Sequence, residues 1–489
     1  MELCDRSIHE LHRLRLAKEV STEEIARAVL GRIERVEPRL HAFITLAPEG
    51  VLDRAREADQ ALARGEALSP IAGMPLALKD IFCTKGLKTT CGSRILHNFV
   101  PPYDATVVER LRARGLNLLG KTNMDEFAMG SSTEGSAFGP TRNPWDTERV
   151  PGGSSGGMAA AVAAGEALGG IGTDTGGSIR QPASFTSLVG LKPTYGRVSR
   201  YGMIAYGSSL DQGGPLARDV TDAALLLGII AGHDPRDSTS APRPVPDYVA
   251  ALGGDLKGRK VGLIRELETQ GDGQIDAEVA RQFQDNLSTL RALGAETVEV
   301  SLPRLEYAIA VYYILAPSEA SSNLGRYDGV RYGLRQDGSD LESLYKKTRE
   351  AGFGAEVKRR IMLGTFALSA GYYDAYYNRA MRIRELLRAD FAQAFARVHL
   401  IALPTSPVPA FRLGEKLDDP LQMYLVDAFT LPVNLAGLPA ISVPGGFTAS
   451  GLPLGLQLVA GHFAEERLLQ AAQAFQEATD YHRRRPVLT

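Results

Sequence analysis

Two serines, Ser154 and Ser178, lie 24 residues apart in glycine-rich surroundings and are the residues of this chain best suited to nucleophilic chemistry. Glycine lets backbone N–H groups approach a ligand closely and permits positive φ. A serine flanked by such amides combines a nucleophile with a site for an oxyanion. No histidine lies between His97 and His233, so no nearby imidazole can complete a Ser-His-Asp arrangement. The base for these serines must be another type of residue or come from a distant segment.

Lys79 is the first candidate for that base. It ends the apolar run 75–79, which has the length and composition of a buried strand. A lysine accepts a proton only when its amine is neutral, and burial lowers the pKa of an amine. Asp80 follows directly and could pair with Lys79 instead. A strand-end lysine whose amine stays in solvent is a further alternative, and the sequence leaves all three open.

The glycine-rich segment 152–157 has competing interpretations. A phosphate-binding P-loop requires Lys after its last glycine, whereas Gly157 is followed by Met158. The spacing of a dinucleotide-binding fingerprint is absent as well. Taken alone, the segment could be an ordinary tight turn, so its meaning depends on what surrounds it.

Composition narrows the class of protein. The chain has 489 residues with 44% hydrophobic and 23% charged residues, which is typical of a globular protein. A net charge of −2 argues against broad electrostatic contact with nucleic acid. Three cysteines are too few for a disulfide framework or a four-ligand zinc site, so we expect no metal and a reducing compartment. Without an N-terminal signal or an apolar run of membrane-spanning length, we expect a cytoplasmic protein with no membrane contact.

Helical and strand patterns alternate along most of the chain, which favours a layered α/β fold in one large domain. The helical opening at 7–37 contains a capping box in which Ser21 starts a helix and Glu24 follows three residues later. A region rich in helix formers and tyrosines spans 305–390. Further helices are expected at 54–65, 106–114, 158–167, 220–231, 277–293 and 464–479, and strands at 75–79, 116–120, 169–172, 260–263, 297–300, 400–403, 440–443 and 455–459.

Three motifs in this order and spacing resemble the amidase signature family. They are the segments 74–80, 152–157 and 172–183, which contain Lys79, Ser154 and Ser178 respectively. The resemblance implies one amidase domain over 1–489 with a central mixed β-sheet flanked by helices on both faces. It further implies an N-terminal helical layer at 1–65, a signature core at 70–220 and a substrate-specificity region at 300–440.

The same resemblance implies a Ser-Ser-Lys triad that hydrolyses amides. Ser178 would attack the amide carbonyl, and Ser154, preceded by a cis peptide bond, would relay the proton. Lys79 would be the final base and would later return the proton to the departing ammonia. Backbone amides around Ser178 would form the oxyanion hole, namely those of Thr175, Gly176, Gly177 and Ser178 itself. Asp174 and Arg180 are expected to hold this loop as an ion pair, without reacting.

Other segments resemble the glutamine-hydrolysing subunits of tRNA-dependent amidotransferases within that family. These segments are 124–134, 318–324, 356–369 and 423–440. This narrower resemblance implies that Arg360 holds the α-carboxylate of glutamine and that Asp427 holds its α-ammonium. It also implies substrate contact by Tyr312 or Tyr313, and a pocket lined by Met129, Gly130 and Ser131.

The residues alone leave plainer interpretations of this substrate site. Arg360 stands in a basic run and could be a solvent-exposed helix charge, and Asp427 could be a helix-capping or surface acid. Two positions depart from the pattern of the resembling subunits. Gly135 stands where asparagine is usual, and Gly213 stands where an apolar residue is usual. Both are expected near the site, where they could alter loop stiffness.

The resemblance implies a carbon–nitrogen ligase subunit with glutamine as amido donor. Ammonia would pass through an internal channel to a B subunit, which uses ATP and magnesium to amidate Glu-tRNA(Gln) and contacts most of the tRNA. A small C subunit would complete a heterotrimer, and this chain itself would bind no cofactor. Whether Asp-tRNA(Asn) is also served stays open. The alternatives are a stand-alone amidase for another small amide and a non-catalytic scaffold. The basic segment 483–485 is expected in solvent, with RNA contact as the alternative.

Overall fold

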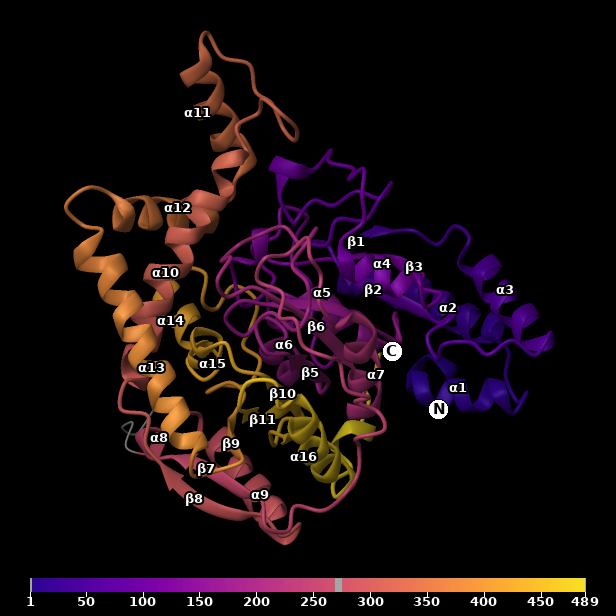
Figure 1. Cartoon of the computed structure of the whole chain (residues 1–489). Coiled ribbons are helices and arrows are strands. Elements are labelled where there is room, and N and C mark those ends of the chain that lie inside the picture. Colours follow the sequence, from indigo (N-terminus) through magenta and orange to yellow (C-terminus); the bar gives the residue numbers. More distant parts are fainter. Residues whose placement is uncertain (1, 269–274, 489) are drawn as a thin grey trace.

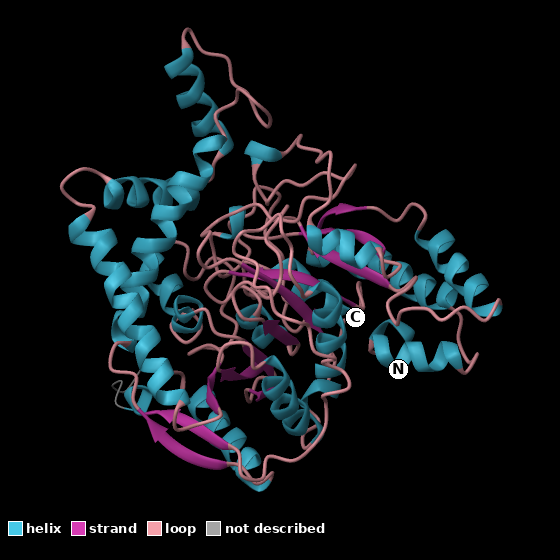
Figure 2. Cartoon of the chain, viewed as in Figure 1, coloured by secondary structure: helices cyan, strands magenta, loops and turns pink. Residues whose placement is uncertain are grey.

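The computed structural model describes residues 2–268 and 275–488. A mixed β-sheet of eleven strands runs through the described part of the molecule, with helices arranged around it (Figures 1 and 2). The strands are β1 (Phe43–Leu46), β2 (Pro75–Lys79), β3 (Asn117–Thr122), β4 (Gly169–Asp174), β5 (Val189–Lys192), β6 (Gln212–Ala217), β7 (Lys260–Ile264), β8 (Glu296–Val300), β9 (Leu400–Pro404), β10 (Ala440–Phe447) and β11 (Pro453–Ala460).

The strand order is β1-β3-β2-β4-β6-β5-β10-β11-β9-β7-β8. β2 runs parallel to both β3 and β4, and β7 runs parallel to β8 and β9, whereas the remaining pairs are antiparallel. The expected α/β class with a mixed central sheet is therefore confirmed. β2 and β4 are direct neighbours, so the segments that follow them start from the same edge of the sheet.

Helices cover both faces of this sheet. They are α1 (Ile8–Leu16), α2 (Thr22–Leu40), α3 (Val51–Ala63), α4 (Thr106–Arg112), α5 (Gly156–Ala164), α6 (Arg180–Thr186), α7 (Val220–Ile230), α8 (Arg265–Glu268), α9 (Ala277–Ala292), α10 (Ala308–Asn323), α11 (Leu341–Gly352), α12 (Ala355–Leu368), α13 (Arg379–Phe395), α14 (Pro420–Leu425), α15 (Leu431–Ala436) and α16 (Glu465–Glu477). On β4, Gly169 faces Ile8 and Leu226 of α1 and α7, whereas Gly170 faces Met158 of α5. Successive strand residues point to opposite faces, so these helices lie on opposite sides.

The two ends of the chain lie close together (Figure 1). The capping box expected at the start of α2 is present, because Ser21 Oγ accepts from the N–H of Glu24 at 3.1 Å. At the other end, Arg485 donates to the carbonyl of Asp5 at 2.9 Å. Arg483 and Arg484 are exposed as expected, but Arg485 is half-buried against the N-terminal segment. No helix in the described ranges is both long and apolar enough to cross a membrane.

The region between β8 and β9 contains the long helices α10 to α13, and α11 with part of α12 forms an arm that projects from the body (Figure 1). The helix-rich composition of 305–390 is thus confirmed. The sequence patterns did not indicate three of the strands: β1 at one edge of the sheet, and β5 and β6, which join its halves. β5 has only four residues, and β6 consists largely of small residues; both are buried throughout, so neither has the alternating burial of a half-buried strand.

We expect Gly157→Ala to destabilise the fold, because α5 meets the backbone of two other segments at this position. A Cβ at Gly157 would lie 2.5 Å from the carbonyl oxygens of Ala42 and Asn123. Overpacking of this kind typically costs about 1–3 kcal/mol. Gly31→Ala, in α2 with nothing within 4 Å of its Cβ position, is the matched control and should leave stability unchanged or raise it. Thermal unfolding of both variants measures the difference; equal midpoints would contradict the tight approach at Gly157.

Candidate active site

Lys79 lies at the end of β2, fully buried, with its amine among hydroxyl groups. Its Nζ donates to Ser154 Oγ at 2.7 Å and to Thr173 Oγ1 at 2.9 Å. Thr173 belongs to β4, the parallel neighbour of β2, so the sheet itself sets this geometry. The solvent-exposed alternative for Lys79 is wrong. Its partners are neutral oxygens, which solvate the amine without fixing a positive charge on it.

Asp80 does not pair with Lys79. Its side chain lies beside Lys121, whose Nζ is 3.1 Å from Asp80 Oδ1, and Oδ2 accepts from the N–H of Thr90 at 2.8 Å. Lys121 in turn donates to the carbonyl of Phe82 at 2.8 Å. Because consecutive residues of a strand end project to opposite sides, the adjacent acid and base are separated. The pairing alternative left open by the sequence is therefore wrong.

Burial lowers the pKa of Lys79 from its ordinary value to about 7, against the opposing effect of the carboxylates of Asp125, Asp174 and Asp211. A low-dielectric environment disfavours the charged amine, and no carboxylate of residues 2–268 and 275–488 is hydrogen-bonded to it. At neutral pH a substantial fraction of Lys79 is then neutral. An amine poised in this way can take a proton from a hydroxyl group.

Ser154 lies between the lysine and the loop of the second serine. The peptide bond Gly153–Ser154 is cis, and the N–H of Gly153 donates to Gln181 Oε1 at 2.9 Å. The N–H of Ser155 donates to the carbonyl of Ser178 at 3.3 Å, which ties the two glycine-rich loops together. Ser154 is fully buried, whereas Ser178 is 7% exposed. Ser178 is thus the more accessible of the two hydroxyl-bearing residues.

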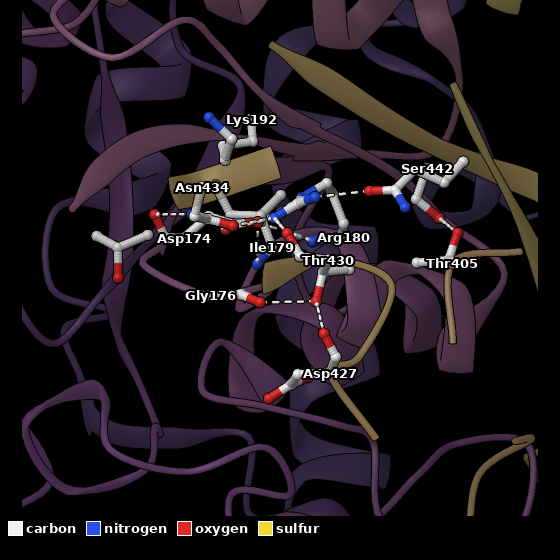
Figure 3. A network of polar contacts seen from close by, with 12 residues as sticks. Asp174, Gly176, Ile179, Arg180, Lys192, Thr405, Asp427, Thr430, Asn434 and Ser442 are labelled. Atoms are coloured by element: carbon white, nitrogen blue, oxygen red, sulfur yellow. Dashed lines mark hydrogen bonds and ion pairs between the residues drawn. The ribbon is translucent and has the colours of Figure 1, made fainter. Parts of the chain in front are cut away.

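The loop that carries Ser178 is held by a buried ion pair (Figure 3). Arg180 Nε donates to Asp174 Oδ2 at 2.9 Å, and both side chains are inaccessible to solvent. The same guanidinium donates to Gln457 Oε1 at 2.6 Å and to Asn434 Oδ1. The expected Asp174–Arg180 pair is therefore present. It connects the loop after β4 with β11 and α15, and removing one partner of such a pair typically costs about 3–5 kcal/mol.

Backbone N–H groups accumulate beside Ser178 without acceptors. Within the described part of the chain, the N–H groups of Gly176, Gly177 and Ser178 donate to no protein atom. The opposite side of the loop is anchored, because Thr430 Oγ1 donates to the carbonyl of Gly176 at 2.6 Å and Thr175 Oγ1 donates to Asp211 Oδ1 at 2.7 Å. Free, preorganised amides next to a hydroxyl nucleophile are what a tetrahedral oxyanion requires.

A cavity of about 220 Å³ lies beside Asp125, which forms part of its wall. Two groups of residues from distant parts of the chain face each other across it: Met129, Gly130, Ser131 and Gly135 on one side, and Glu356, Arg360, Met423 and Tyr424 on the other. The cavity thus brings together most of the residues expected to bind substrate. Close packing of Gly153 against Ser131 and Ser132 places this cavity next to the loop of Ser154.

Asp427 is a buried carboxyl with one unused oxygen. Its Oδ2 accepts from Ser131 Oγ, whereas Oδ1 is buried without a hydrogen-bond partner. Burial raises the pKa of Asp427 to about 7. The alternative of a surface acid is wrong, since Asp427 is 7% exposed. A cationic group that approached Oδ1 would compensate this carboxylate and favour its ionised form.

Arg360 is equally buried, at 3% exposure, so its alternative as a solvent-exposed helix charge is wrong. Its Nη1 donates to the hydroxyl of Tyr206 at 2.8 Å and its Nε to Glu356 Oε1 at 2.8 Å. The rings of Tyr206, Tyr313 and Tyr424 surround the guanidinium. Among the described residues, Nη2 has no hydrogen-bond partner, which leaves it available to an anion in the cavity.

The two candidate tyrosines occupy different places. Tyr312 lies against the loop of the nucleophile, because a Cβ built on Gly176 would be 2.8 Å from its hydroxyl. Tyr313 stacks on Tyr424 with ring centroids 3.8 Å apart and belongs to the aromatic surround of Arg360. Both are therefore near the site, Tyr312 at the reacting end and Tyr313 at the guanidinium end.

Several residues of this region carried no role in the sequence analysis. Thr173, Asp125 and Tyr206 contact or face the predicted site residues, yet each lies in a segment where its type alone is unremarkable. The two atypical glycines are both close: Gly135 donates to Asp125 Oδ1 at 3.2 Å, and Gly213 is the cross-strand partner of Thr173. Their expected location is confirmed, and their effect on loop stiffness stays a prediction.

One group in the described residues has the spacing of metal ligands, namely His9, Asp219 and Asp222. Asp222 accepts from the N–H groups of Ile8 and His9, and Asp219 accepts from the N–H of Asp222. These carboxylates therefore cap the starts of α1 and α7, which accounts for the cluster without a metal.

Comparison with known proteins gives one consistent picture. The Amidase family profile matches residues 24–469. The A subunit of glutamyl-tRNA(Gln) amidotransferase from Moorella thermoacetica is 60% identical over 488 residues, covering 100% of this chain and 99% of that protein. The crystal structure of the corresponding protein from Thermotoga maritima is 42% identical, with a TM-score of 0.82 and coverage of 98% and 96%. A 6-aminohexanoate cyclic dimer hydrolase is 28% identical, with a TM-score of 0.83 and 99% coverage of each chain.

We expect amide hydrolysis by this site to rise with pH and to level off above about pH 7. Neutral Lys79 is the active form, its fraction increases as pH passes its pKa of about 7, and the rate should fall about tenfold per pH unit below it. The measurement is kcat/KM against pH. Lys79→Met should abolish most activity, since general-base catalysis typically contributes about 10²–10⁴-fold.

Lys192 supplies the matched control. Burial also lowers its pKa to about 7, but its Nζ donates to the carbonyl of Pro193 at 3.0 Å and to no serine. Lys192→Met should keep the midpoint of the pH profile. A flat profile between pH 6 and 8 in the unaltered protein, or the same loss in both variants, would contradict the assignment of Lys79.

Proposed function

The chain belongs to the amidase family, and from this premise we propose that it is the glutamine-hydrolysing A subunit of a glutamyl-tRNA(Gln) amidotransferase, a carbon–nitrogen ligase with glutamine as amido donor. The observation that carries this proposal is a pair of unused polar atoms at the site: a guanidinium nitrogen of Arg360, which lines the cavity, and a buried carboxylate oxygen of Asp427, whose other oxygen binds Ser131 of the cavity wall. Full-length identity of 60% to a protein with that name supports the same substrate.

Glutamine presents an α-carboxylate and an α-ammonium at one end and a neutral amide at the other. The guanidinium of Arg360 takes the carboxylate, and the free Oδ1 of Asp427 takes the ammonium. The amide end is then directed toward the loop of Ser178, beside Tyr312. Two fixed charges of opposite sign reject apolar amides, because an apolar group would leave Asp427 Oδ1 and the free guanidinium nitrogen of Arg360 without hydrogen-bond partners.

Hydrolysis proceeds through an ester on Ser178. Ser178 Oγ attacks the amide carbon of glutamine, its proton passes to Ser154, and the Ser154 proton passes to neutral Lys79. The amide oxygen becomes an oxyanion that the free N–H groups of Gly176, Gly177 and Ser178 stabilise. When the carbon–nitrogen bond breaks, the proton returns from Lys79 through Ser154 to the leaving nitrogen, which departs as ammonia. Water, activated by the same groups, then cleaves the glutamyl ester to glutamate.

The ammonia serves a second polypeptide. The relatives with full-length identity are named as one subunit of an amidotransferase, so this chain works in a multi-subunit complex. In the proposed complex, a B subunit uses ATP and magnesium to activate Glu-tRNA(Gln) and contacts the tRNA, whereas a small C subunit joins the two. A net charge of −2 and the docking of Arg485 on Asp5 support tRNA contact mainly outside this chain.

The decisive test replaces Ser178 with alanine in the assembled enzyme. We expect Ser178→Ala to abolish amidation of Glu-tRNA(Gln) with glutamine while amidation with added ammonium chloride continues at the unaltered rate, since only the source of ammonia is lost. Product formation is measured by separating Gln-tRNA(Gln) from Glu-tRNA(Gln). Glutamine-dependent amidation by Ser178→Ala would contradict the nucleophile and favour a scaffold. Efficient hydrolysis of apolar amides by the isolated chain would favour a stand-alone amidase.

Asp427→Asn and Arg360→Gln test the substrate site. Each leaves one charge of glutamine without a partner inside a buried cavity, which typically costs about 2–5 kcal/mol. We expect the KM for glutamine to rise about 100-fold, equivalent to about 2.7 kcal/mol, with amidation from ammonium chloride unchanged. Arg388→Gln on α13, which removes an exposed charge paired with Glu385, is the control. An unchanged KM in both site variants would overturn the glutamine assignment.

A further inference from the structure

Asp125 and Glu126 are consecutive buried carboxyls that turn in opposite directions. The N–H of Asp125 donates to the carbonyl of Ser154 at 3.3 Å, and its carboxylate accepts from the N–H of Thr133 at 2.9 Å, so Asp125 faces the catalytic loops. Glu126 faces away, toward α12. The next two residues, Phe127 and Ala128, have φ of +50° and +61°, which reverses the chain at this point.

Glu126 supplies the N-terminal cap of α12 from a segment 228 residues away. Its Oε2 accepts from the N–H of Gly354 at 2.7 Å, and its Oε1 accepts from Ser93 Oγ. Gly354 is the N-cap residue of α12 and has no side chain to cap the helix itself. A Cβ there would lie 2.5 Å from Glu126 Oε2, so the carboxylate approaches as closely as a glycine permits. A negative charge at a helix N-terminus is favourable.

The capped helix carries Arg360. Glu356, in its first turn, accepts from Arg360 Nε at 2.8 Å and from the hydroxyl of Tyr424 at 2.8 Å. The second half of α12 is fixed differently: at Gly364 the helix lies against the backbone of Pro317 in α10, where a Cβ would be 1.9 Å from a carbonyl oxygen. The first half continues into the projecting arm of α11 (Figure 1), and Glu126 ties it to the body beside the cavity.

We propose that Glu126 is a positioning residue for substrate selection: by holding the first turn of α12, it fixes the guanidinium of Arg360 where the α-carboxylate of glutamine binds. The inference rests on the proposed function, because it takes Arg360 as the carboxylate contact. Glu126 touches neither the amide nor the triad, so its effect is confined to the charged end of the substrate.

A purely structural role for Glu126 would have a different signature. General loosening of the fold would weaken the binding of every ligand and would lower kcat as well. A displaced guanidinium weakens the binding only of ligands that carry a carboxylate. It leaves the rate at which bound substrate is hydrolysed almost unchanged. Glutamine and 4-aminobutanamide, which is glutamine without its carboxylate, therefore separate the two roles.

The experiment uses Glu126→Gln in the assembled enzyme at pH 8, above the value of about 7 to which burial raises the pKa of Glu126. The amide that replaces the carboxylate can still accept from the Gly354 N–H and donate to Ser93 Oγ, so this variant removes the negative charge at the N-terminus of α12 and keeps the shape of the side chain. Loss of this charge loosens the first turn of α12, and we expect the glutamine KM to rise about tenfold, equivalent to about 1.4 kcal/mol. The kcat should stay within about threefold, and the inhibition constant of 4-aminobutanamide within about twofold.

Gly354→Ala reaches the same contact from the helix side, because its Cβ pushes against Glu126 Oε2. It should reproduce the rise in glutamine KM and serves if Glu126→Gln does not fold. Glu342→Gln, an exposed acid in the first turn of α11, is the matched control and should change nothing.

Two results would overturn the inference: a glutamine KM unchanged in both Glu126→Gln and Gly354→Ala, or an inhibition constant of 4-aminobutanamide that rises in parallel with that KM. Arg360→Gln in the same assay distinguishes failure of the positioning role of Glu126 from failure of the proposed function. If Arg360→Gln raises the KM and the other two variants do not, the positioning role of Glu126 fails and the glutamine site stands.

Discussion

The site depends on burying an amine without giving it a carboxylate partner. Lys79 is fully buried and donates to two hydroxyl oxygens, of Ser154 and Thr173. A carboxylate in either place would fix the ammonium form and remove the base. The neighbouring Asp80 does not pair with Lys79, because it forms an ion pair with Lys121 on the opposite side of the strand end. The two buried lysines at this strand end therefore differ in role: Lys121 neutralises an acid, whereas Lys79 is proposed to stay available as a base.

Sheet order explains how this arrangement is assembled. Because β2 and β4 are parallel neighbours, Lys79 and Thr173 meet at one edge, and the nucleophile loop begins where β4 ends. That loop is completed from far away, since Arg180 joins Asp174 to Gln457 and Asn434 of the C-terminal part. The loop of Ser178 consequently reaches its position only when β4 and β11, which are separated by three strands in the sheet, have both formed. Because Arg180 is buried and joins distant strands of one sheet, a single large domain provides these contacts more readily than a site between two separate domains would.

The sequence predicted the site where contacts are local and missed those that join distant segments. The strand 75–79, the capping box at Ser21 and the Asp174–Arg180 pair follow from neighbouring residues, and all are present. The sequence did not predict which way the Asp80 side chain points, because its partner Lys121 lies on a different strand, β3. The burial of Arg360 was equally hidden, since a basic run on a helix has the composition of a solvent-exposed face. Contacts such as the one between Glu126 and Gly354 leave no periodic signal at all.

Chemistry and substrate choice lie on different parts of the fold, and this division bears on the range of amides that related proteins take. The proposed triad belongs to the sheet edge and its loops, whereas the two proposed contacts to the charged groups of glutamine come from helix α12 and the segment after α14. A cyclic dimer hydrolase with 28% identity has the same fold over 99% of each chain, so this fold tolerates extensive sequence change. Among the described residues of this chain, Asp427 Oδ1 is buried without a hydrogen-bond partner beside the cavity, and a guanidinium nitrogen of Arg360 in the cavity wall is unused. Leaving buried polar groups unpaired destabilises the empty site, and only a ligand with both opposite charges offsets that cost completely. In this proposal, the unsatisfied groups of the protein select glutamine over other amides. The selectivity then depends on how firmly α12 holds the guanidinium of Arg360 in place.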